Sequence, residues 1–189
     1  MLRLAMKKTG ILLTIILAVF CLSPLFGTDR QPINVNLIID GSSSFTAVKG
    51  EIITWINRRI DQLLVNGDRV TVWSAETVSR VVYSGTINGP ADRDAVKAQI
   101  REISGTGETA DFSRALREAS AGAGALSGTP FSYTLLINAS PGTLSSILSG
   151  PDASQLRFSR IEEFPGWRAF VVGLNIDSRV RRAASAFMN

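Results

Sequence analysis

Residues 33–44 read INVNLIIDGSSS, and this stretch indicates the class of fold. Its first seven residues alternate and then become wholly apolar, which is typical of a buried strand. Asp40 and Gly41 end the strand, three serines follow, and apolar residues then recur every three or four positions over residues 46–64. That spacing predicts an amphipathic helix. The chain therefore contains a strand that leads almost directly into a helix.

Strands and helices continue to alternate toward the C-terminus. We expect further strands over residues 69–75, 80–83, 133–137 and 168–174, and helices over residues 92–103, 111–123 and 178–187. We also expect short helices over residues 144–148 and 155–163. This alternation predicts an α/β fold with a doubly wound, mostly parallel sheet of five or six strands and helices on both faces. No internal repeat is visible, so residues 28–189 are predicted to form one domain.

Residues 1–27 have a different character. Basic residues precede a twelve-residue, almost wholly apolar run at residues 11–22, and Pro24 follows it. This order predicts a secretory signal, and the run is short beside the roughly 20 residues of a spanning helix, although an uncleaved anchor is the alternative. A lipid-attachment signal ending at Cys21 is disfavoured because the bulky Phe20 precedes it. We expect a bacterial protein that is periplasmic or otherwise outside the cytoplasm, free or held at the inner membrane by its leader.

The charge and composition exclude several functions. The net charge is +4, but Arg3, Lys7 and Lys8 belong to the leader, and without them 17 basic residues face 16 acidic ones. We therefore expect no nucleic-acid partner, and contact with a membrane only through the leader. The chain has no histidine, and Cys21 is its one cysteine, so imidazole and thiol catalysis are both excluded. No residue is predicted to be catalytic or to bind an organic cofactor.

The pattern Asp-x-Ser-x-Ser, formed by Asp40, Ser42 and Ser44, follows the first strand within NLIIDGSSSF. Together with the order of strands and helices, it resembles the von Willebrand factor A family. Residues 67–85 (GDRVTVWSAETVSRVVYSG) are similar to the family's second and third strands. The segments GTGETADFSRALREA and YTLLINASPG are similar to its second metal loop with the following helix and to its fourth strand. The resemblance extends over residues 33–175 and implies a domain that binds a partner.

In that family the motif forms a metal-ion-dependent adhesion site. The resemblance implies that Asp40, Ser42 and Ser44 hold Mg²⁺ or Mn²⁺, and a carboxylate with several hydroxyl groups suits such a hard cation. The site would lie just past the end of a strand, where open α/β sheets bind their ligands. The ion keeps one position open, which implies a protein partner with an acidic side chain.

Two further family positions match less well. The family supplies a threonine from a second loop, and Thr109 stands one residue away from the expected place, so Asp111 is the alternative ligand. The family's fourth strand ends in Thr-Asp-Gly, whereas residues 138–140 read NAS, which puts Ala139 where the family has its aspartate. One carboxylate fewer weakens the predicted cation binding.

Other interpretations stay open. Residues 40–44 also fit a turn and a helix N-cap, because Asp and Ser are preferred there. A domain without metal would be a structural or assembly component of the cell envelope. A hydrolase or metal-dependent enzyme is disfavoured because a serine nucleophile would lack a histidine base. The loop at residues 105–110 resembles a dinucleotide fingerprint but follows a predicted helix rather than a strand. Three tryptophans are expected to pack in the core: Trp55, Trp73 and Trp167.

Overall fold

The computed structural model describes residues 31–124, 132–139 and 157–173, and the structural statements below concern these residues. The predicted leader and the predicted helices over residues 144–148 and 178–187 lie outside them. Among the helices in the described ranges, none combines the length and the apolar character that crossing a membrane requires.

The described strands form one six-stranded sheet in the order β3-β2-β1-β4-β6-β5. The strands are β1 (Asn34–Asp40), β2 (Arg69–Ala75), β3 (Arg80–Thr86), β4 (Ser132–Asn138), β5 (Arg157–Phe164) and β6 (Trp167–Gly173). β1 is central and runs parallel to β2 and β4, while β3, β5 and β6 pair in antiparallel fashion with their neighbours. We call the side where β1, β2 and β4 end the carboxyl edge, and the side where they begin the amino edge.

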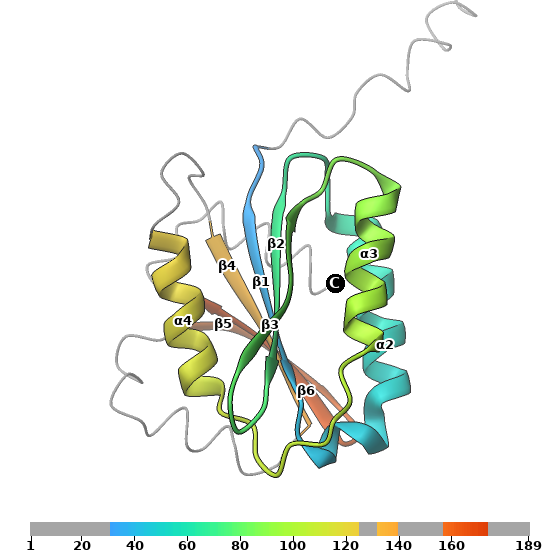
Figure 1. Cartoon of the computed structure of the whole chain (residues 1–189), viewed down its shortest axis with the longest axis vertical. Coiled ribbons are helices and arrows are strands. Elements are labelled where there is room, and N and C mark those ends of the chain that lie inside the picture. Colours follow the sequence, from blue (N-terminus) through green and yellow to red (C-terminus); the bar gives the residue numbers. More distant parts are fainter. Residues whose placement is uncertain (1–30, 125–131, 140–156, 174–189) are drawn as a thin grey trace, which may run out of the picture. The chain divides into compact units, whose positions relative to one another are not determined.

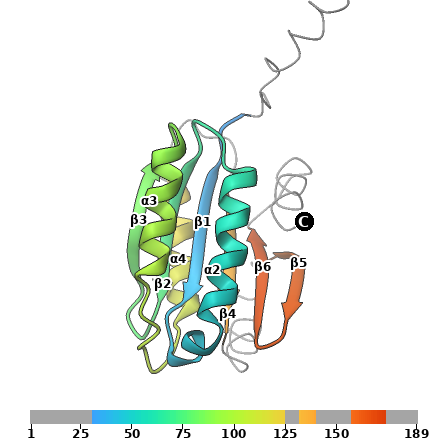
Figure 2. The same cartoon turned by 90° about the vertical axis from the view of Figure 1, so that its right-hand side faces the viewer.

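The helices cover both faces of the sheet, as Figures 1 and 2 show. α2 (Ser43–Leu63) and α3 (Pro90–Arg101) lie on one face, and α4 (Phe112–Gly124) lies on the other. The α/β fold with a mostly parallel centre and helices on both faces, predicted from the sequence, is thereby confirmed.

The short helix predicted over residues 155–163 is wrong, because this stretch contains most of β5. A two-residue turn at residues 165–166 joins β5 to β6, and Gly166 adopts the left-handed φ of 84° that such a turn favours. A turn this short can join only antiparallel strands. β6, the next strand, is antiparallel to β4.

Two apolar clusters hold the layers together. The larger one lies between the sheet and the helices α2 and α3, and Ile52, Ile56 and Ile60 contribute to it from one stripe of α2, each with an exposed fraction of 0%. The smaller one joins α4 to the other face through residues such as Phe112 and Phe170. Burying each of these large side chains stabilises the fold by about 1.5–3 kcal/mol. Trp167 is 3% exposed, so its predicted place in the core is confirmed.

Candidate functional site

Backbone hydrogen bonds tie together the loops at the carboxyl edge. Gly41 N donates to Ala75 O at 2.8 Å, which links the end of β1 to the end of β2. Gly107 N donates to Gly41 O at 3.0 Å, and Ser43 N donates to Gly107 O at 2.8 Å. The loop before α4 therefore lies directly on the Asp-x-Ser-x-Ser loop. We call residues 40–44, 76–79 and 103–111 the edge loops.

Side chains and a further backbone bond anchor the same loops. From α2, Thr46 Oγ1 donates to Gly105 O at 3.1 Å and Lys49 Nζ donates to Ile103 O at 2.8 Å. Asp111 N donates to Glu76 O at 3.1 Å, which joins the third edge loop to the second. Three segments that are far apart in the sequence thus form one connected surface.

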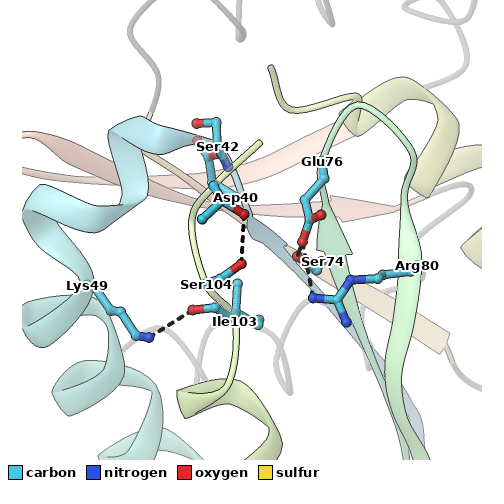
Figure 3. A network of polar contacts seen from close by, with 9 residues as sticks. Asp40, Ser42, Lys49, Ser74, Glu76, Arg80, Ile103 and Ser104 are labelled. Atoms are coloured by element: carbon cyan, nitrogen blue, oxygen red, sulfur yellow. Dashed lines mark hydrogen bonds and ion pairs between the residues drawn. The ribbon is translucent and has the colours of Figure 1, made fainter. Parts of the chain in front are cut away.

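Asp40 lies beneath the centre of this surface. Its side chain is buried, with an exposed fraction of 0%. Ser42 N donates to Oδ1 at 2.9 Å, and Ala139 N, at the end of β4, donates to Oδ2 at 2.9 Å. Figure 3 shows the carboxylate among the edge loops, facing Ser104. Each carboxylate oxygen therefore accepts a backbone N–H, and the side chain joins the ends of β1 and β4.

The hydroxyl groups predicted as ligands lie in different surroundings. Ser42 is 2% exposed and takes the N-cap position of α2, but its side chain makes no capping hydrogen bond. Ser44 is exposed on the first turn of that helix, and Thr109 is exposed in the third edge loop. The structure thus brings the loops of Ser42 and Thr109 together through Gly107, with two of the three hydroxyl groups at the surface.

Asp111, the alternative ligand, has a local partner. Arg114 N donates to Asp111 Oδ1 at 2.9 Å, immediately before α4 begins at Phe112. This contact is that of a helix N-cap, which satisfies one of the free N–H groups of the first turn. Ser79 Oγ donates to Asp111 O at 3.2 Å. Asp111 therefore holds the start of α4 against the second edge loop.

Glu76 is a residue of this edge that sequence reasoning missed. Its Oε1 accepts hydrogen bonds from Ser74 Oγ at 2.7 Å and from Arg80 Nη2 at 3.2 Å, as Figure 3 shows. A Cβ added to Gly41 would lie 2.5 Å from both Glu76 Cγ and Ser74 Oγ, so Gly41 leaves room for this carboxylate. β1 and β2 are parallel and Asp40 pairs with Ala75, so Glu76, the residue after β2, lies beside Gly41. The parallel arrangement expected from the sequence was the signal that could have placed Glu76 at this edge.

The donor set of this edge bears on the predicted divalent cation. Such an ion needs oxygen ligands that can turn toward it, together with enough negative charge. The Asp40 carboxylate is fully buried against two backbone N–H groups, and Glu76 is paired with Arg80. Ala139 replaces the family's second carboxylate, and its N–H is one of the two that bind Asp40. In the part of the chain that the structure describes, no three His, Cys, Asp or Glu side chains could hold a metal ion together. In this conformation the backbone holds the Asp40 carboxylate, and the cation implied by the resemblance stays a prediction.

Comparison with known proteins adds a partial structural likeness. No protein-family model matches the chain, and no curated protein is similar enough to match it. The chain is similar to a solved structure of a von Willebrand factor type A from Catenulispora acidiphila, with 24% identity and a TM-score of 0.40. The match covers 48% of this chain and 22% of that chain. The assignment of the α/β fold class rests on the strand order and helix placement described above.

Proposed function

We propose that the chain is a protein-interaction module with a von Willebrand factor A-like fold, which binds its partner at the carboxyl edge and does so without a cation. The observation that carries this proposal is the hydrogen-bonded network of the three edge loops. A surface whose loops are already fixed loses little conformational entropy on binding, which favours affinity.

The side chains that these loops expose support a protein partner. Val78, in the second edge loop, is 61% exposed, and Val81, at the start of β3, is 47% exposed. In the part of the chain that the structure describes, these are the exposed large hydrophobic residues. Ser44 and Thr109 add exposed hydroxyl groups on neighbouring loops. Exposed apolar side chains together with polar groups are typical of a protein interface.

A photo-crosslinking residue tests the surface directly. It is placed at Val78, at Thr109 and, as a control, at Thr54, which is exposed on α2. In cells that express the full chain, we expect adducts of the same mass from Val78 and Thr109 and none from Thr54, with or without chelator. Equal adducts at all three positions, or none at either edge position, would contradict the proposal.

The competing hypothesis is a cation at Asp40 that binds a partner's acidic group. Thermal unfolding of the full chain, first with chelator and then with millimolar Mg²⁺ or Mn²⁺, separates the two, because a ligand of the native state must raise its stability. We expect the same midpoint under both conditions. A rise of several degrees that Asp40→Ala abolishes would support the cation and contradict the present proposal.

Export stays a prediction that rests on the predicted leader at residues 1–27. It places the module in the periplasm or elsewhere outside the cytoplasm, where its partner would also be found. The mass of the protein recovered from the periplasmic fraction checks this prediction. A protein that is found in the membrane fraction and still contains residues 1–27 would support the anchored form. A protein found in the cytoplasm would contradict export.

A further inference from the structure

A cavity of about 470 Å³ lies on the α4 face of the sheet, toward the amino edge. β1, β2 and β3 form its floor, and Glu118 and Ala119 of α4 line one side. Toward the carboxyl edge of the same face, α4 packs on apolar residues such as Ile38 and Leu136. Toward the amino edge, the floor is polar instead.

Two asparagines of β1 make this floor unusual. β1 is flanked by β2 and β4, and strands buried on both faces are normally apolar throughout. Yet Asn34 and Asn36, which line the cavity, are only 5% and 8% exposed. Burying an amide lowers stability unless the amide is hydrogen-bonded. A central strand with two buried amides on one face therefore calls for an explanation other than packing.

Two residues that line the cavity also have unsatisfied hydrogen-bonding groups. Asn34 Oδ1 and Trp73 Nε1 are both buried and have no hydrogen-bond partner. Native proteins leave few such groups, and each one that remains needs an explanation, such as a water or an ion bound there. One of these atoms needs a donor and the other needs an acceptor. A suitable ligand must therefore provide both.

The remaining lining residues indicate the chemistry of that ligand. Thr71 Oγ1 and Ser84 Oγ lie 3.4 Å apart on neighbouring strands and add hydroxyl groups to the floor. Arg69 and Glu118, the two charged residues of the lining, have opposite charges. The site thus has no excess of one charge. The indole ring of Trp73 offers an apolar surface beside these polar groups.

We propose that this cavity binds a neutral saccharide of one or two sugar units. Each sugar hydroxyl both donates and accepts a hydrogen bond, as the pair Asn34 Oδ1 and Trp73 Nε1 requires. The volume falls within the range of about 300–1,000 Å³ that small-molecule sites occupy. The proposal is independent of the interaction module at the carboxyl edge, because the two involve different residues at opposite ends of β1.

Titration of the full chain with sugars tests the proposal. The probes are glucose, N-acetylglucosamine, maltose and diacetylchitobiose, with their methyl glycosides to imitate chain ends and glycylglycine as a zwitterionic control. Calorimetry is expected to show saturable binding of at least one sugar and none of the dipeptide. Binding of the dipeptide alone, or of no probe up to its solubility limit, would overturn the proposal.

Two substitutions locate the binding. Asn34→Leu removes the buried unsatisfied amide, so we expect sugar binding to be lost while the thermal midpoint rises or stays the same. Trp73→Phe keeps a ring but removes the N–H, and we expect the affinity to fall about tenfold, the effect of losing one hydrogen bond. If Asn34→Leu fails to fold, the second variant still decides the matter. Unchanged affinity in Trp73→Phe, or in a folded Asn34→Leu, would overturn the proposal.

Asn57→Leu is the matched control. Asn57 Oδ1, on α2, is also buried and unpartnered, but this residue does not line the cavity. We expect this variant to bind the sugar as the unsubstituted chain does. A loss of affinity equal to that of Asn34→Leu would show that the effect is a general response to altered packing, and would overturn the assignment to the cavity.

Discussion

The buried polar side chains at the two ends of β1 differ in their hydrogen bonding. At the carboxyl edge, Asp40 is fully buried and each of its carboxylate oxygens accepts a backbone N–H. At the amino edge, Asn34 is 5% exposed, and its Oδ1 has no partner. A satisfied buried group stabilises the architecture, whereas an unsatisfied one lowers stability.

Asp68 shows how little a buried aspartate says about metal binding. It is 0% exposed and lies just before β2, away from the edge loops. Its oxygens accept Ile33 N at 3.1 Å and Val65 N at 2.9 Å, which joins the start of β1 to the turn after α2. No metal motif surrounds it, yet its backbone contacts are of the same kind as those of Asp40. The contacts of Asp40 are therefore explained by its structural role.

Asp40→Ala is expected to have the largest effect on stability. It leaves Ser42 N and Ala139 N without their acceptor in a buried place, and each loss costs about 1–3 kcal/mol. We expect the free energy of unfolding, measured with a denaturant, to fall by about 3 kcal/mol with chelator present. Asp68→Ala is the control and should lose a similar amount. If Asp40→Ala is neutral without metal, the carboxylate is not a structural link and the comparison fails.

Gly41→Ala tests how closely the edge loops pack. The added Cβ would lie 2.5 Å from Glu76 Cγ and Ser74 Oγ, so we expect a loss of about 2 kcal/mol in denaturant unfolding, typical of overpacking. The same change in a Glu76→Ala background should cost less, because part of the clash is gone. Gly50→Ala, where a Cβ on α2 meets no atom within 4 Å, should instead raise stability by about 1 kcal/mol. Equal effects at both glycines would contradict the description of the edge.

A contact near the surface provides the smallest expected effect. Lys97 of α3 binds Asp61 of α2, and this hydrogen bond raises the pKa of Lys97, with a second contribution from Asp94. A raised pKa in the folded state means that the contribution is present below pH 10.5 and is lost as the pH rises further. We expect Lys97→Met to lower the free energy of unfolding by about 0.5 kcal/mol near neutral pH. High salt should reduce this difference, and a difference that grows with pH would contradict the assignment.

Much of the secondary structure was predictable because its patterns are local. The strand ending at Asp40, the helix after it and the following strand pair each have a clear apolar period, and the structure confirms them. β5 was missed because Phe158, Ile161 and Phe164 stand three residues apart, a spacing that fits a helix as well. A register shift between Phe158 and Arg160 marks a bulge in this strand. Such an extra residue breaks the alternation that identifies strands.

Apart from β5, the sequence alone determined which of the described segments are strands and helices, and that the Asp40 loop follows a buried strand, because apolar periodicity and chain order are local properties. The tertiary structure determined what these residues contact. The Ala139 N–H reaches Asp40 only when β4 pairs with β1, and Glu76 covers Gly41 only when β2 lies beside them. Among the described residues, the polar cavity around Asn34 likewise lies beside the apolar contacts that α4 makes on the same face. The pairing of distant strands and the placement of helices depend on the whole chain, so no local sequence pattern predicts them.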